Sequence, residues 1–164
     1  MENWILYLCL SLGFVSALVA GVFQSFSDFV MAGLARAEPA GGIESMQNIN
    51  RTVFRSVFLT SFLLLVPLTT GFAFYAALQT RGAGRAFVIA AAVTYVLAVF
   101  AVTIAGNVPM NKRLDRLDHA SSEAASYWRT YYRTWTRWNH VRTMGSAATA
   151  ALYLLAAAAF SSTT

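Results

Sequence analysis

The chain has 164 residues, of which 57% are hydrophobic and only 12% are charged, with a formal net charge of +5. Soluble domains usually carry about twice this charged fraction, so the composition argues against a soluble enzyme. A basic chain could bind nucleic acid, but here the basic residues flank hydrophobic runs, which indicates a lipid bilayer as partner and no nucleic acid.

Four segments are mostly apolar and approach the length of about 20 residues that a helix needs to cross a bilayer. Their apolar interiors lack Lys and Arg. The sequence therefore predicts an all-α fold, a single integral membrane domain over residues 1–164 that forms an antiparallel four-helix bundle. The predicted spans are 4–31, 52–78, 86–107 and 138–160, and polar connectors cover 32–51 and 108–137.

The first span ends in polar residues. Gln24 and Asp28 fall on one helical stripe with small residues such as Gly13, and small residues let a neighbouring helix approach closely in lipid. A carboxylate at membrane depth is costly and normally faces a partner or a wet cavity. We therefore expect this stripe to face the bundle and Asp28 to be buried near Arg51 or Arg142.

The next two spans also have polar ends on the same side. A helix start over residues 43–55 is dense in polar side chains, and Pro67 within the second span is expected to kink it. The third span ends in Thr103, Asn107 and Asn111 at i, i+4 spacing. Pro109 interrupts this region, so we expect the helix to bend or to stop there.

The stretch 127–143 interleaves aromatic rings with arginines. On a continuous helix one face carries five of its large side chains, and a second face carries three arginines. Such side chains are stable where hydrocarbon meets water, which predicts an aromatic, arginine-rich interfacial extension before the last span. The first face holds Trp128, Tyr131, Trp135, Trp138 and Arg142, and the second holds Arg129, Arg133 and Arg137.

Asn139 lies on the tryptophan face, which we expect to point at the third span. His140 lies nearer the arginine face. Either His140 points away from the bundle, or the helix is broken before Gly145 and the imidazole turns inward. The spacing alone leaves both alternatives open.

Four spans joined by short connectors alternate in direction, so all these polar ends meet at one mouth of the bundle. We interpret the cluster as a ligand pocket, since bundle mouths commonly hold ligands. The alternative is that the polar groups only cap helices and pair charges. The candidate substrate-binding residues are Gln24, Gln47, Asn50, Arg51, Asn107, Asn111, Trp135, Trp138, Asn139 and Arg142, and the candidate catalytic bases are Asp28, Glu44 and His140.

Metal and cofactor motifs are sparse. The chain has two histidines, and neither belongs to a paired His-x-x-x-His or Glu-x-x-His pattern. There is no Gly-rich dinucleotide or phosphate-binding motif. The sequence identifies no metal ligands. It is compatible with a protein that has no cofactor, with one that binds haem and with one that binds a single metal ion.

Four blocks in order, residues 21–31, 42–51, 106–111 and 135–143, resemble the signature blocks of the anthrone oxygenase-like family of small membrane proteins, also called the domain of unknown function 1772 family. Fungal members are similar to enzymes that oxidise polyketide anthrones to anthraquinones with O₂. Members often carry Pro where Ala32 stands and Asn-Pro where Arg55 and Ser56 stand. These departures imply a different loop beside the pocket, and with it a different substrate.

The resemblance and the pocket favour an oxidoreductase, specifically a monooxygenase-type enzyme, acting on a planar, lipophilic phenol- or quinone-type molecule. A desolvated carboxylate or His140 would act as base, the arginines and asparagines would stabilise an enolate, and the tryptophans would stack on the ring system. One alternative is a non-catalytic binding protein for haem, quinone or lipid. Another is an assembly partner of a membrane complex, and a homo-oligomer is compatible with each.

Basic residues predict the orientation. The connectors at the polar mouth hold eight Lys and Arg, whereas the opposite side has only Arg81 and Arg85. Because positive charge is retained in the cytoplasm, we expect both termini outside, in a bacterial inner (plasma) membrane.

Overall fold

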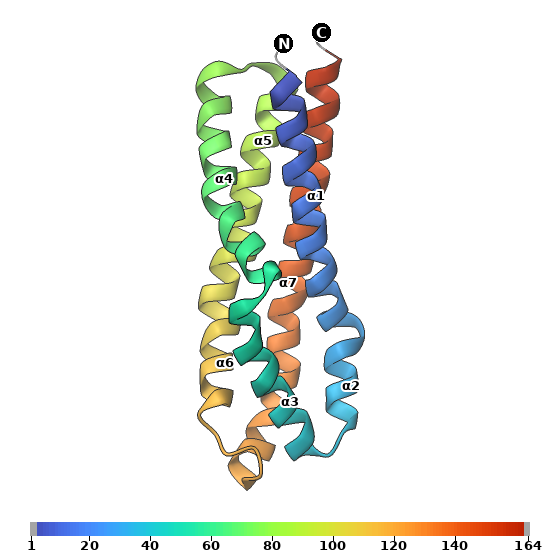
Figure 1. Ribbon diagram of the computed structural model, residues 1–164, viewed down its shortest axis with the longest axis vertical. Coiled ribbons are helices and arrows are strands. Elements are labelled where there is room, and N and C mark those ends of the chain that lie inside the picture. The colour runs from blue at the N-terminus through green and yellow to red at the C-terminus, as the bar shows by residue number, and fades with distance from the viewer. Residues whose placement is uncertain (1–2, 163–164) are drawn as a thin grey trace.

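The computed structural model describes residues 3–162 as an antiparallel bundle of four long helical rods (Figure 1). It is 92% helical and contains no strand in this range, which confirms the all-α bundle. The first two rods comprise α1 (Asn3–Ser25), η1 (Phe26–Val30) and α2 (Met31–Arg36), then α3 (Pro39–Thr52), η2 (Val53–Arg55) and α4 (Val57–Gln79). The others comprise α5 (Gly82–Thr94), η3 (Tyr95–Ala101), η4 (Thr103–Asn107) and α6 (Val108–Asp115), then α7 (Ser122–Ser161).

Four helices are long and apolar enough to cross a membrane: Trp4–Arg36, Val57–Gln79, Gly82–Asp115 and Ser122–Ser161. At 1.5 Å per residue the 40-residue α7 is about 60 Å long, roughly twice the hydrocarbon thickness of a bilayer. The segments predicted as polar connectors are mostly helical in the structure. The aromatic extension and the last span form one unbroken helix.

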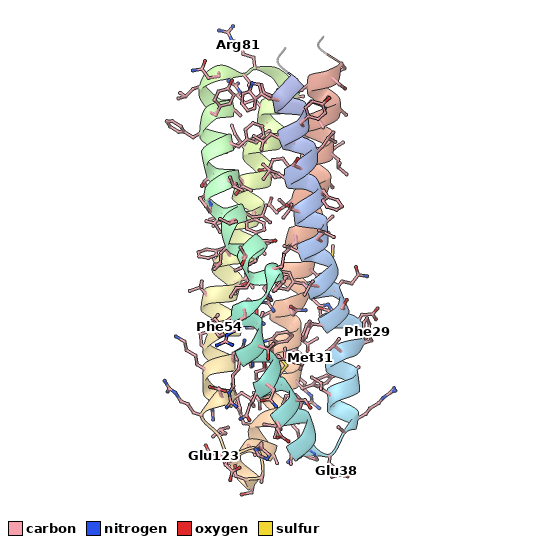
Figure 2. All side chains as sticks on the ribbon, viewed as in Figure 1. Phe29, Met31, Glu38, Phe54, Arg81 and Glu123 are labelled. Atoms are coloured by element: carbon pink, nitrogen blue, oxygen red, sulfur yellow. The ribbon has the colours of Figure 1, made fainter. Side chains whose placement is uncertain are left out.

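The bundle has two unlike halves. The apolar half contains the start of α1, the end of α7 and the turn at Arg81, and comprises α1, α4, α5 and the C-terminal part of α7 (Figure 2). The polar half contains α2, α3, α6 and the N-terminal part of α7, with Glu38 and Glu123 at its far end (Figure 2).

The apolar half is held by close helix–helix approach. Helix α7 packs against α1 and α5, and α4 packs against α5 and α1. A Cβ at Gly145 of α7 would lie 2.8 Å from the Ala98 Cβ, and a Cβ at Gly13 would lie 3.4 Å from the Tyr153 Cβ. Small residues thus let the backbones approach, and Gly13 faces the bundle as the sequence predicts.

The polar half is held by stacked rings and by hydrogen bonds between helices. On α7 the ring centroids of Trp128 and Tyr131 lie 5.5 Å apart, and those of Tyr131 and Trp135 lie 6.0 Å apart. The Gln47 Nε2 donates to the Leu114 and Leu117 carbonyl oxygens at 2.8 and 2.9 Å. This amide therefore joins α3 to the C-terminal end of α6.

Three wide turns of π-helix interrupt the rods, at η1, η3 and η4. The helix does not stop at Pro109, because the π-turn of η4 accommodates the proline ring before α6 continues. Helix α4 likewise runs unbroken through Pro67. The second rod does break, at Ser56, whose extended backbone ends η2 and whose Oγ caps α4 by accepting from the Leu59 N–H at 3.1 Å.

Candidate functional site

A cavity of about 370 Å³ lies where the apolar half meets the polar half. Residues from every rod line it: α1, η1, α3, η2, α4, η4, α6 and α7 all contribute. Its volume falls in the range typical of small-molecule sites. Most of the wall is apolar or aromatic, including Phe23, Phe26, Met46, Ile49, Phe58 and Phe62.

The break between α3 and α4 marks the mouth of the cavity. Phe54 lines the cavity and yet is 77% exposed, so its ring stands at the opening (Figure 2). Nearby Val57 is 82% exposed. An exposed apolar rim is typical of a surface that contacts lipid or another apolar partner.

Charged residues on the rim tie two walls together. The Arg51 Nε of α3 donates to the Asp115 Oδ1 of α6 at 2.8 Å, and both side chains are about half exposed. Lys112 lines the cavity beside them. This ion pair holds the two polar helices across one side of the opening.

Arg142 is the charged group that is buried within the cavity wall, with 6% of its surface exposed. Its guanidinium carbon lies 4.3 Å from the Phe23 ring centroid and 5.1 Å from that of Trp135. Its Nη2 donates to the Asn139 Oδ1 at 2.5 Å, whereas its Nε has no acceptor in the described chain. No carboxylate within residues 3–162 pairs with it. A buried cation without a counter-ion is costly, and such a charge commonly marks a binding site.

Asn139 positions this arginine. Its side chain is fully buried, and its Nδ2 donates to the Phe23 carbonyl at 2.6 Å and to the Ser27 Oγ at 2.7 Å. The prediction that Asn139 points at the third span is therefore wrong, because its hydrogen bonds lead to the first rod. There the π-turn of η1 changes the pattern of backbone hydrogen bonds next to the Phe23 carbonyl.

Asn111 and Asn107 connect the third rod to α7 as expected. The Asn111 Oδ1 accepts from the Tyr131 hydroxyl at 2.8 Å and from the Trp135 Nε1 at 2.7 Å. The Asn107 Nδ2 donates to the Trp135 carbonyl at 3.1 Å. Asn111 therefore fixes the ring of Trp135 and Asn107 fixes its backbone, and Trp135 lines the cavity.

Six of the ten candidate substrate-binding residues line the cavity, and four do not. Gln47 and Asn107 are buried outside it and bond to backbone carbonyls. Gln24 is exposed. Trp138 is 42% exposed and packs on Gly106. The six that the structure brings together are Asn50, Arg51, Asn111, Trp135, Asn139 and Arg142.

The three candidate bases, Asp28, Glu44 and His140, are exposed and lie outside the cavity lining. The expectation that Asp28 is buried near Arg51 or Arg142 is wrong. Asp28 lies within the π-turn of η1, which rotates the helix away from the 3.6-residue periodicity, and Arg51 pairs with Asp115 instead. Helix α7 is unbroken through position 145, so His140 takes the outward orientation.

The structure also reveals lining residues that sequence reasoning missed. Phe58 and Phe62 pack on Phe23, with ring centroids 5.4 and 6.1 Å away. Apolar side chains at the ends of spans carry no chemical signal, although the shared i, i+4 aromatic spacing could have indicated a wall. Within residues 3–162 no group of three His, Cys, Asp or Glu residues could hold a metal ion.

The chain was compared with protein families, curated proteins and solved structures. A family model described as anthrone oxygenase matches residues 51–152, more than half of the chain. The matched region begins at the end of α3 and includes the cavity residues of α4, η4, α6 and α7. Neither the curated proteins nor the solved structures contain a significant match.

Proposed function

The chain belongs to the anthrone oxygenase family, and from this premise we propose that it binds a planar, lipophilic phenol- or quinone-type molecule in the cavity and oxidises it with O₂. The observation that carries the proposal is an aromatic-walled cavity of about 370 Å³ that contains one buried, uncompensated cation, Arg142. We propose the lipid bilayer as the reservoir of this ligand, because the rim at Phe54 is apolar and exposed.

The aromatic walls suit a flat ring system. The Phe26 and Trp135 rings border the cavity with centroids 5.9 Å apart, and Phe23 and Phe58 meet edge to face at 5.4 Å. Aromatic pairs favour offset or edge-to-face contact, so rings fixed at several angles can hold a planar molecule. The hydrogen bond from the Trp135 Nε1 to Asn111 keeps that ring from rotating.

The reaction that fits this cavity is oxidation of an activated CH₂ group to a carbonyl. Loss of one proton from a CH₂ conjugated with a ketone leaves an enolate, whose negative charge rests mainly on oxygen. O₂ then adds to the carbon, and the O–O bond breaks as water leaves. One oxygen atom enters the product and the other leaves with the two hydrogens, so no further reductant is needed.

Arg142 would stabilise the enolate oxygen, because a fixed cation in a water-poor site strongly favours developing negative charge. Asp115 is the carboxylate among the cavity-lining residues, and we propose it as the proton acceptor. Its pairing with Arg51 at 2.8 Å holds it at the rim, where a proton can pass on to solvent.

The test is turnover of 1,8-dihydroxyanthrone by the protein reconstituted in lipid nanodiscs. We expect one O₂ consumed per anthraquinone formed, at a rate well above that of empty nanodiscs. Val22→Trp should abolish this excess, because Val22 lines the cavity and a large ring there would fill it. The matched control is Val141→Trp on the exposed face of α7, which should retain full activity. A rate equal to that of empty nanodiscs would contradict the proposal.

A second candidate function is binding of the same class of molecule without chemistry. The observation that favours it is the exposure of Asp28, Glu44 and His140, which leaves Asp115 as the carboxylate in the cavity lining. Saturable binding of a hydroxyanthraquinone that Val22→Trp abolishes, with no oxygen uptake from the anthrone, would select this alternative.

For the orientation, we propose a bacterial inner membrane with the polar half in the cytoplasm and both termini outside. The support is the exposed row of Arg129, Arg133 and Arg137 in the polar half, against Arg81 and Arg85 at the other end. A C-terminal alkaline phosphatase fusion should be active and a C-terminal fluorescent protein fusion dark. The reverse pattern would overturn the orientation.

A further inference from the structure

Arg142 carries a hydrogen-bond donor that the protein leaves unused. Only 6% of the Arg142 surface is exposed, and its Nε is a buried atom without an acceptor in the described chain. Leaving a buried donor unpaired costs about 1–3 kcal/mol, and more for a charged group. An anionic ligand beside the guanidinium would offset the cost of this buried, unpaired cation.

The protein holds the arginine in place without neutralising it. Asn139 accepts from the Arg142 Nη2, and the same amide donates to the Phe23 carbonyl and to the Ser27 hydroxyl. A neutral amide orients a guanidinium but leaves its charge intact. The Phe23 and Trp135 rings contribute the negative faces of their π-systems, which attract a cation more weakly than a carboxylate does.

The other charged groups around the cavity do not neutralise Arg142. Asp115 bonds Arg51, and Lys112 adds a further positive charge to the lining. The Tyr131 hydroxyl, also close to Arg142, donates to Asn111. The cavity lining therefore contains three cations, Arg51, Lys112 and Arg142, and one carboxylate.

We propose that Arg142, positioned by Asn139, is an anion-binding site, and that the cavity binds its aromatic ligand with an acidic oxygen already deprotonated. The ligand class is thus a phenol, enol or similar acid whose ionised oxygen pairs with the Arg142 guanidinium. The inference rests on the proposed function only in taking an aromatic molecule as the occupant of the cavity. It does not require turnover. Asn139 is a positioning residue that acts through Arg142.

The colour of a bound dye tests this directly. We would titrate 1,2-dihydroxyanthraquinone, whose phenol and phenolate absorb at clearly different wavelengths, with and without the protein in nanodiscs. An opposite charge in contact lowers the pKa of an acid by about 1–3 units, so the bound dye should change colour about one pH unit or more below the free dye. Its dimethyl ether, which cannot ionise, should bind at least roughly tenfold more weakly, because one charged hydrogen bond of about 1.5–3 kcal/mol is lost.

Two variants separate the anion site from the cavity as a whole. Arg142→Gln should abolish the colour shift and the preference over the dimethyl ether, whereas Arg137→Gln, which alters an exposed arginine on the same helix, should retain both. Asn139→Asp places a carboxylate beside Arg142 and keeps the side-chain size. It should weaken dye binding at least roughly tenfold and leave the affinity for the dimethyl ether unchanged, because the internal anion replaces that of the ligand.

The outcomes distinguish this inference from the proposed function. A bound dye that stays neutral in the wild type, or a shift that survives in Arg142→Gln, would overturn the anion site. A normal shift without oxygen uptake would remove the oxygenase and leave the anion site standing. Oxygen uptake without any colour shift would remove the anion site and leave the oxygenase standing.

Discussion

The two halves of the bundle are built by different means. In the apolar half, glycines let neighbouring helices approach closely: Gly145 lies against Ala98, and Gly84 lies against the Phe160 ring. Its buried threonine hydroxyls, such as that of Thr149, bond to carbonyls of their own helix, whereas the Tyr95 hydroxyl donates across helices to the Phe62 carbonyl at 2.8 Å. In the polar half, amides and indoles bond across helices, as Asn111 does to Tyr131 and Trp135.

The cavity lies where one mode of packing gives way to the other. Helices that approach at glycines leave little room between them, whereas in the polar half α7 presents a row of large stacked rings, Tyr127, Trp128, Tyr131 and Trp135. The π-turns η1 and η4 both contribute residues to the cavity wall. Such turns are frequent at functional sites, because the wider turn reorients side chains. The site therefore depends on the polar half for its shape.

The largest expected effect on stability is that of Asn111→Leu. It leaves the Tyr131 hydroxyl and the Trp135 indole N–H without their acceptor, and at about 1–3 kcal/mol each the free energy of unfolding should fall by roughly 2–6 kcal/mol. Thermal unfolding in detergent, followed by circular dichroism, measures this. The control Asn48→Leu alters an exposed asparagine of α3 and should change little. Equal losses would mean that cross-helix bonds do not hold the polar half.

Gly145→Leu should have the next largest effect and test the apolar half. Its Cβ would lie 2.8 Å from the Ala98 Cβ and 3.0 Å from the Val99 Cγ2, so helices α7 and α5–η3 must separate, at a cost of about 1–3 kcal/mol. At Gly71 an added Cβ meets nothing within 4 Å, so in Gly71→Leu stability should hold or rise. Dye affinity of the folded Gly145→Leu fraction should stay unchanged. A loss of dye affinity with normal stability would mean that Gly145 shapes the cavity and does not hold the apolar half together.

The smallest effects are expected at the exposed titratable residues. Asp28→Asn, Glu44→Gln and His140→Ala should each leave anthrone turnover within about twofold, because surface substitutions away from a site rarely change free energies by more than about 0.5 kcal/mol. Asp115→Asn should lower turnover much more. If His140→Ala abolished turnover in folded protein, the catalytic role predicted for His140 would hold and our choice of Asp115 would be wrong.

Hydropathy was sufficient to predict four helices and the meeting of their polar ends. Polar patterning added the helix start over 43–55 and the aromatic extension before the last span, but it did not predict the helices α2 and α6, because their packing depends on rings and amides that meet only in the fold. The prediction that Asp28 is buried is wrong for a local reason: a continuous 3.6-residue period does not apply across the π-turn of η1.

The candidate site was predictable in part. Arg142, Asn139 and Trp135 carried visible chemistry on one face of a long helix, and the structure brings them together. Phe23, Phe58 and most of the remaining wall are apolar residues, which on sequence alone look like any other membrane core. The direction of Asn139 depended on which rod stands beside α7, and spacing along one helix does not contain that information.

The most direct test of a cavity between the two halves is quenching of single tryptophans by bound 1,2-dihydroxyanthraquinone. Trp135 lines the cavity, whereas Trp4 precedes the cavity residue Phe23 on the same helix by a rise of about 28 Å. We would compare a variant that retains only Trp135 with one that retains only Trp4, the other tryptophans being replaced by Phe. Saturable, nearly complete quenching of Trp135 with much weaker quenching of Trp4 is the result we predict. Equal quenching of the two, or stronger quenching of Trp4, would contradict the account.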